Sequence, residues 1–175
     1  IQEKEALLVE LLNIKIMKLR AIDSALELND EYEAMLEDNV LGRSLVAVAQ
    51  AMKADTAKEI RDKLKWLSLS NVHFDDLHKK WPNNIIVHVY HASTLAALPP
   101  EVGARDEAIT LVESLLKQGD LSELKDYETQ IEYIIAVLIK SSGSKEGDQR
   151  LKEVQETFLS LFAHTRGNRS GALDG

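Results

Sequence analysis

The sequence predicts an all-α protein of about seven mostly antiparallel helices. Three observations support this fold class. Leu, Ala, Ile, Glu and Lys dominate the composition, and only 5% of the 175 residues are aromatic, a mixture that favours helices over strands. Apolar residues recur every three or four positions, the period of an amphipathic helix. Helix pairs also recur, at an offset of roughly 42 to 47 residues. We therefore expect either an irregular bundle or a short stack of αα-hairpins.

The first predicted helix covers residues 1–28 and is the longest amphipathic stretch of the chain. It contains neither Pro nor Gly. A helix of this length cannot bury its apolar stripe against itself, so other helices or another chain must cover it. We expect it to cap the helical array or to form the contact surface of a homo-oligomer, and to be mostly buried in either case. Its stripe consists of Leu8, Leu11, Leu12, Ile16, Leu19, Ile22 and Leu26.

Two helices are predicted next, over 31–53 and 57–69. The dipeptide Asn29-Asp30 ends the first helix and offers an N-cap for the second, because short polar side chains accept hydrogen bonds from free backbone N–H groups. Asp55 or Thr56 offers an N-cap for the third helix in the same way.

Gly42 lies inside the second predicted helix, where glycine costs up to about 1 kcal/mol relative to alanine. It indicates either a close helix crossing or a local break. Residues 71–84 are predicted to form an irregular connector. This connector ends with Trp81-Pro82-Asn83-Asn84, because the residue before a proline is driven away from helical geometry and the Asn pair can cap the helix that follows.

Four further helices follow, and the first three are closed by residues that interrupt helices. Pro99-Pro100, Gly119 and the cluster from Ser141 to Ser144 supply these stops. The predicted ranges are 85–98, 104–118, 121–140 and 148–164. Residues 165–175 have little to bury and are predicted to be a flexible tail.

The predicted helices belong to a single domain, residues 1–164. Beyond the N-terminal helix, helical hairpins cover 31–70 and 85–164 and are joined by the connector 71–84. Such a repeat is typical of TPR-like or HEAT-like stacks, but any chain of antiparallel helices of similar length gives a similar spacing. The sequence leaves both the bundle and the stack open.

The composition excludes several classes of function. The net charge is −8, with 21 basic and 29 acidic residues, so the chain lacks the basic face that a nucleic-acid partner requires. It has no cysteine, which excludes disulfides, thiolate zinc sites and a Cys nucleophile. No apolar run reaches the roughly 18 to 20 residues that a membrane span needs.

The same features predict where the protein works. The lack of cysteine and of a visible signal peptide predicts an intracellular, cytoplasmic location. The chain begins with Ile1 rather than Met, so we expect it to be part of a longer protein.

Four of the five histidines lie between residues 73 and 91. His88 and His91 are three residues apart and share one face of a predicted helix. Together with a His or Asp of the preceding connector, such as His73 or His78, they would suit a zinc ion. The alternative is that the connector histidines are solvated and the helical ones are half-buried and hydrogen-bonded. The pair of helical histidines lacks the tight signature of a known metal motif, so we assign no metal ligand, and a metal- or ligand-binding role of His88 and His91 stays an alternative.

The remaining polar residues predict no enzymatic activity and no cofactor. The carboxylates sit beside lysines on helix faces, as Glu123, Asp126 and Glu128 do around Lys125, which is typical of solvated ion pairs. The sequence contains no Gly-rich phosphate loop, and its serines lack the context of a nucleophile elbow. We therefore assign no catalytic residue.

The large aromatic side chains are the candidate partner-binding residues: Trp66, Trp81 and Tyr90. Aromatic side chains serve equally well as core residues and as anchors for a partner. Trp66 is expected in the core, and Trp81 either in the core or on a contact surface. The predicted function is a protein-interaction or scaffold module that presents helical grooves to a partner protein or peptide.

The stretch Leu11–Asp23 resembles the second helix of BAG domains, three-helix co-chaperone modules that bind the ATPase part of heat-shock chaperones. The shared element is Leu11-Leu12 followed by a Leu-x-x-Ile-Asp rhythm, and Val46 to Gln50 stands where the family's third helix has Val-x-x-Val-Gln. The resemblance covers about 40 residues. It implies a BAG-like co-chaperone as a further alternative. The family's third helix is rich in Arg and Lys, whereas only Arg43 and Lys53 stand near that position here.

Overall fold

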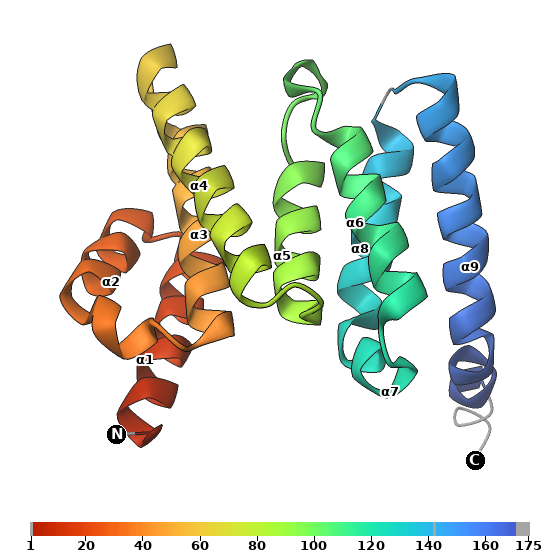
Figure 1. Ribbon diagram of the computed structural model, residues 1–175, viewed down its shortest axis with the longest axis horizontal. Coiled ribbons are helices and arrows are strands. Elements are labelled where there is room, and N and C mark those ends of the chain that lie inside the picture. Colours follow the sequence, from red (N-terminus) through yellow and green to blue (C-terminus); the bar gives the residue numbers. More distant parts are fainter. Residues whose placement is uncertain (1, 142, 171–175) are drawn as a thin grey trace. The chain divides into compact units, whose positions relative to one another are not determined.

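The computed structural model describes residues 2–141 and 143–170, with backbone alone for 164–170 (Figure 1). All regular structure in this part of the chain is helical, which confirms the predicted all-α class of about seven helices. The chain divides into two compact units, Ile1–His91 and Ala92–Gly175. Each unit is described by itself, and the single domain predicted for 1–164 stays a prediction.

The first unit is built around an antiparallel hairpin of two long helices, α3 and α4, which pack along each other (Figure 1). Two shorter helices, α1 and α2, pack beside α3 and are linked by one turn of π-helix, η1. The unit also contains the beginning of α5. The bounds are α1 Gln2–Asn13, η1 Ile14–Lys18, α2 Ile22–Leu36, α3 Val40–Thr56, α4 Ile60–Lys80 and α5 Ile85–Ala96.

The prediction of one continuous helix over 1–28 is wrong. The backbone widens into the π-turn η1 and then breaks at Arg20, whose φ of 54° is left-handed. The break turns α2 back toward α1, so the apolar stripe is divided between two helices that bury it in a shared cluster. Leu11 and Leu19 fall outside this cluster and are 41% and 66% exposed, contrary to the expected burial of the stripe. The cluster consists of Leu8, Val9, Leu12, Ile16, Ile22, Ala25, Leu36, Leu45, Val46 and Ala49.

The second helix was predicted over 31–53 after a break at Asn29-Asp30, and both bounds are wrong. Asn29 is buried inside α2, which continues to Leu36. The cap residue is Asn39, whose Oδ1 accepts a hydrogen bond of 2.8 Å from the N–H of Gly42 at the start of α3. Gly42 also marks a close crossing, because a Cβ atom there would lie 2.8 Å from the buried Leu36 side chain.

The irregular connector predicted for 71–84 is also wrong, because α4 continues to Lys80. Its buried face runs on through Ser70, Phe74 and Leu77, which keeps the helical spacing past residue 69. Ser70 stays inside the helix because its hydroxyl donates to the carbonyl oxygen of Ala47 across the α3–α4 contact, at 2.8 Å. Only the end of the predicted connector, at Trp81-Pro82, interrupts the helix.

Asn84 caps the next helix as expected, since its Oδ1 accepts from the N–H of Ile86 at 2.9 Å. The predicted helix 85–98 is therefore found as α5, which ends at Ala96, shortly before Pro99-Pro100.

The second unit packs α6 against α8 and α9, and α8 and α9 form a hairpin (Figure 1). The predicted helix 121–140 is interrupted by a 3-10 turn, η3, and the predicted helix 148–164 starts earlier, at Lys145. The tail predicted to be flexible over 165–175 is helical in its backbone to Ser170, and 171–175 lie outside the described residues. The bounds are η2 Pro100–Val102, α6 Arg105–Gln118, α7 Leu121–Leu124, η3 Lys125–Tyr127, α8 Glu128–Lys140 and α9 Lys145–Ser170.

The core of the second unit comes from the inward stripes of α6, α8 and α9. Burying each Leu, Ile or Phe side chain contributes about 1.5–3 kcal/mol relative to leaving it in water. The largest buried residues here include Ile109, Ile131, Ile134, Leu138 and Phe162.

Candidate partner-binding site

A cleft of about 480 Å³ lies in the first unit, where the C-terminal halves of α2 and α4 meet the first turn of α3. A volume of this size suits a small ligand or a few side chains of a bound peptide. The lining residues are Glu33, Ala34, Glu37, Arg43, His73, Asp76, Leu77, Lys80 and Trp81.

Trp81 stands directly after α4, where a backbone hydrogen bond and apolar packing hold it in place. Its backbone N–H donates to the carbonyl oxygen of Leu77 at 2.7 Å, and Pro82 prevents the helix from continuing. The indole is half-buried and packs against the apolar cluster of Ala47, Phe74, Leu77 and Val87. The Nζ atom of Lys80 lies 4.8 Å from the centre of the indole ring, within cation–π range. Packing against this cluster therefore fixes the position of the indole, which also lines the cleft.

The two cations of the cleft are already paired with carboxylates. Arg43 Nη1 lies 3.5 Å from Glu33 Oε1. Lys80 Nζ donates to Asp38 Oδ1 and to the carbonyl oxygen of Glu37, both at 2.8 Å. Glu33 and Asp38 are largely exposed, so each pair contributes only about 0–1 kcal/mol to stability.

His73 forms part of the cleft wall and is mostly buried. Its Nδ1 lies 3.2 Å from Gln50 Oε1, an atom that only accepts, so Nδ1 carries the proton and Nε2 is left as an acceptor. This Nε2 is buried and has no hydrogen-bond partner among the described residues. Burial, and next the charge of Arg43, lower the pKa of His73 from 6.5 to about 4, so the ring is neutral at pH 7.

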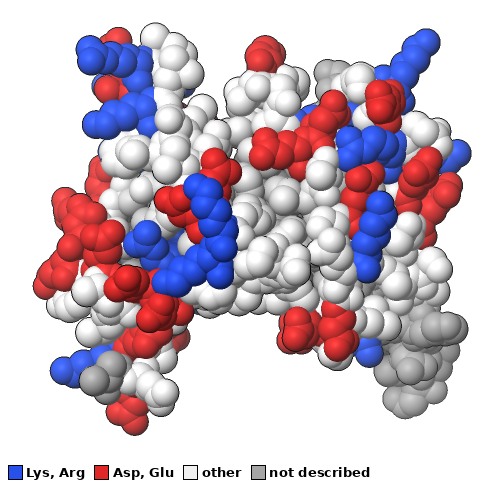
Figure 2. All heavy atoms as spheres, in the orientation of Figure 1, with Lys and Arg blue, Asp and Glu red and all other residues white. Residues whose placement is uncertain are grey.

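The rim of the cleft on the side of α2 is strongly acidic. Residues 21–42 contain seven acidic side chains and no Lys or Arg. Figure 2 shows carboxylates gathered over α2, with basic side chains beside them toward α4. All seven are exposed: Asp23, Glu27, Asp30, Glu31, Glu33, Glu37 and Asp38.

The structure places only one of the three predicted partner-binding residues at the cleft. Trp81 lines it. Tyr90, on α5, is half-buried and packs against both apolar clusters of the first unit. Trp66 is half-buried on α4, with Lys65 Nζ 5.9 Å from its ring centre, and was expected in the core. Neither Tyr90 nor Trp66 lines the cleft.

His78, His88 and His91 form a cluster where α4 meets α5. His78 Nε2 lies 3.0 Å from His91 Nδ1, and the His78 and His88 rings meet edge to face at 4.9 Å. His88 Nδ1 lies 3.0 Å from the carbonyl oxygen of Asn84 and donates a hydrogen bond to it. Burial and the neighbouring histidines lower the pKa of His91 to about 3, and burial lowers that of His78. In the described part of the chain, no group of three or more His, Cys, Asp or Glu side chains is arranged to hold a metal ion.

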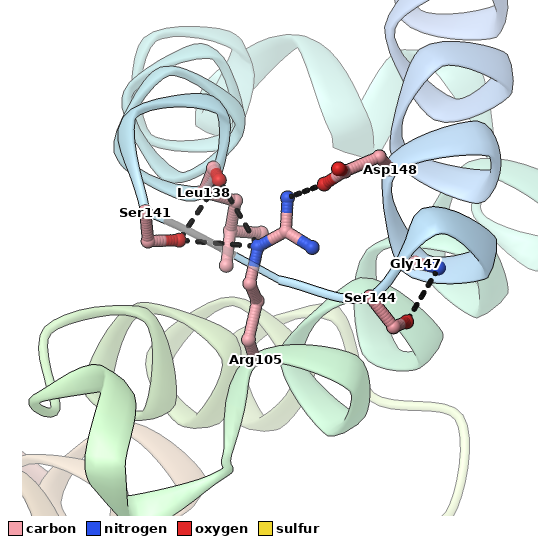
Figure 3. A network of polar contacts seen from close by, with 6 residues as sticks. All are labelled: Arg105, Leu138, Ser141, Ser144, Gly147 and Asp148. Carbon is pink, nitrogen blue, oxygen red and sulfur yellow. Dashed lines mark hydrogen bonds and ion pairs between the residues drawn. The ribbon is translucent and has the colours of Figure 1, made fainter.

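A second polar cluster surrounds Arg105 in the second unit (Figure 3). Its Nε donates to the carbonyl oxygen of Leu138 at 3.2 Å and to Ser141 Oγ at 3.1 Å, and its Nη2 donates to Asp148 Oδ1 at 2.7 Å. The side chain thus joins α6 to the end of α8 and the start of α9. A Cβ atom on Gly143 would lie 2.0 Å from Nη1, so the loop closes directly over the guanidinium. This cluster holds three helices together and leaves no open space for a ligand.

No protein-family model, curated protein or solved structure matches this chain. The stretch Leu11–Asp23 does not form the single helix that its resemblance to BAG domains implies, because η1 and Arg20 interrupt it. Over the part of the chain that the structure describes, no helix is both long and apolar enough to cross a membrane.

The sequence reasoning missed the charged residues of the cleft, Glu33, Glu37, Arg43 and Lys80. A signal for Glu33 and Glu37 was the absence of Lys and Arg from 21–42, which sets this segment apart from the mixed charges elsewhere, whereas no local pattern pointed to Arg43 or Lys80.

Proposed function

We propose that the protein is a non-enzymatic interaction module that binds a segment of a partner polypeptide in the cleft beside Trp81. The observation that carries the proposal is a half-buried indole lining a cleft of about 480 Å³. Residues that dominate binding energy at protein interfaces are enriched in Trp, Tyr and Arg. Trp81 and Arg43 are two such side chains in one cleft.

The chemistry of the cleft favours binding over catalysis. Its two basic side chains are both paired, Arg43 with Glu33 of the cleft and Lys80 with Asp38 of the rim. An active site instead sets a nucleophile beside a base, or an acid and a base around a reacting atom. His73 donates to an amide oxygen and has no nucleophilic side chain within hydrogen-bond distance in the described residues.

The test is affinity capture of a partner by the full chain and by three variants. Trp81→Ala removes the proposed anchor, and Ala34→Met fills the cleft from an exposed position of α2 without disturbing the core. Trp66→Ala is the matched control, because Trp66 is the other half-buried tryptophan and lies outside the cleft. Thermal unfolding of each variant establishes that it is folded.

We expect the wild-type chain and Trp66→Ala to retain a partner equally. Loss of a central interface Trp costs about 2 kcal/mol or more, so Trp81→Ala should weaken retention at least about tenfold, and Ala34→Met should do the same. Retention by a folded Trp81→Ala chain, or loss on Trp66→Ala alone, would place the contact elsewhere. A wild-type chain that retains no partner would contradict the proposal.

A further inference from the structure

We infer that the partner segment bound in the cleft is basic and inserts an Arg or Lys side chain beside Trp81. This inference rests on the proposed function and adds the chemistry of the partner to it. Two features support it, the charge of the cleft and its rim and the aromatic face of Trp81.

The charge around the cleft is negative beyond the paired residues. Arg43 and Lys80 are each matched by a carboxylate, Glu33 and Asp38. Glu37 lines the cleft in addition, Asp76 lines it while paired with Lys79 at 3.0 Å, and α2 continues the acidic surface away from it. An approaching cation is therefore attracted by several carboxylates at once, whereas an acidic segment is repelled.

The aromatic wall fits the same kind of group. The Trp81 ring already accepts the ammonium of Lys80 at 4.8 Å, which shows that its electron-rich face lies within reach of a cation. A guanidinium adds a planar surface that stacks on an indole and a fork of donors that pairs with a carboxylate. Glu33 and Glu37 stand one helical turn apart at the end of α2, and both line the cleft and supply such carboxylates. The charge balance and the aromatic wall therefore both favour a cationic donor.

The experiment selects binding sequences and then measures them. A library of short random peptides is panned against the full chain, and peptides that also bind Trp81→Ala are removed. Selected peptides are titrated against three proteins: the wild type, the triple variant Glu33→Gln/Glu37→Gln/Asp76→Asn, and the control Glu101→Gln/Glu107→Gln/Glu123→Gln. The control removes the same charge from exposed positions of the second unit, far along the chain from the cleft residues.

We expect the Trp81-dependent peptides to be enriched in Arg and Lys. Their affinity should fall at least about tenfold in the triple variant and less than about twofold in the control, and it should weaken as salt is added. Trp81-dependent peptides that are acidic or neutral, or basic peptides unaffected by the triple variant, would overturn this inference and leave the proposed function standing. A selection that yields no Trp81-dependent peptide would overturn both.

Discussion

The Nε2 atom of His78 on α4 lies 3.0 Å from the Nδ1 atom of His91 on α5. One of these two nitrogens must carry a proton and the other must not, so the two rings cannot both be cationic in this arrangement. Phe74 stacks on His91 at 4.4 Å, which removes the imidazole further from water. The contact between α4 and α5 therefore requires that at least one of these two histidines is neutral.

Acid should destabilise the fold through two buried histidines, His73 and His91. In the unfolded chain a histidine has a pKa near 6.5, whereas burial lowers the pKa of His73 to about 4 and that of His91 to about 3. Between these pH values the unfolded chain holds more protons, so their contribution to stability is complete above about pH 6.5 and declines as the pH falls. We expect a loss on the order of 1.4 kcal/mol per pH unit for each histidine that stays neutral. Urea unfolding at a series of pH values measures it.

The variant His91→Phe is the control for this pH dependence. It keeps a flat ring against Phe74 and removes one titrating group, so the slope of unfolding free energy against pH should fall by about one proton. The charged groups near these histidines are unchanged in the variant, Asp75 beside His78 and Arg43 and Asp76 beside His73. An unaltered slope in the variant would show that His91 is not held neutral in the fold.

Gly42→Ala should destabilise the first unit by about 1–2 kcal/mol. Overpacking a core costs about 1–3 kcal/mol, and the better helix propensity of alanine returns up to about 1 kcal/mol. The added methyl would lie 2.8 Å from Leu36 Cδ2 and 3.3 Å from Val9 Cγ2, and both side chains are buried. Urea denaturation monitored by circular dichroism gives the change. A variant more stable than the wild type would mean that α1 and α2 can move away from α3 at no cost in free energy.

Arg105→Met should destabilise the second unit by about 2–3 kcal/mol, because the buried carbonyl of Leu138 and the side chain of Asp148 lose their charged donor. Arg105→Lys should recover little, since an ammonium cannot reproduce the fork of donors. Arg150, whose side chain is 30% exposed against 10% for Arg105, is the matched comparison, and Arg150→Met should cost about 1 kcal/mol or less. Equal effects of Arg105→Met and Arg150→Met would contradict the role assigned to Arg105.

The helices that were predicted most accurately from the sequence are those whose ends carry local signals. The range 104–118 was nearly that of α6, because Pro99-Pro100 precedes it and Gly119 follows it. The break at Arg20 had no such signal, since arginine rarely adopts a positive φ and the apolar stripe continues on both sides. Ser70 likewise suggested a loop, but its hydroxyl is satisfied by α3, a partner 23 residues away in the chain.

The site was predicted only in part for the same reason. Trp81 could be identified from its residue type and from Pro82 beside it. Arg43, Glu33 and Lys80 meet only after α2, α3 and α4 have packed, so no local pattern joins them. Trp66 looked equivalent to Trp81 in sequence, and only the fold separates the tryptophan that lines the cleft from the one that does not.

The central claim is that a partner contacts Trp81, and the indole N–H signals test it most directly. The chain has two tryptophans, so a ¹⁵N-labelled sample gives two such signals, which Trp66→Ala assigns. On addition of the captured partner or a selected peptide, we predict that the Trp81 signal shifts or broadens while the Trp66 signal stays in place. The claim would be contradicted if only the Trp66 signal shifted. It would also be contradicted if neither signal changed once the protein was saturated with its partner.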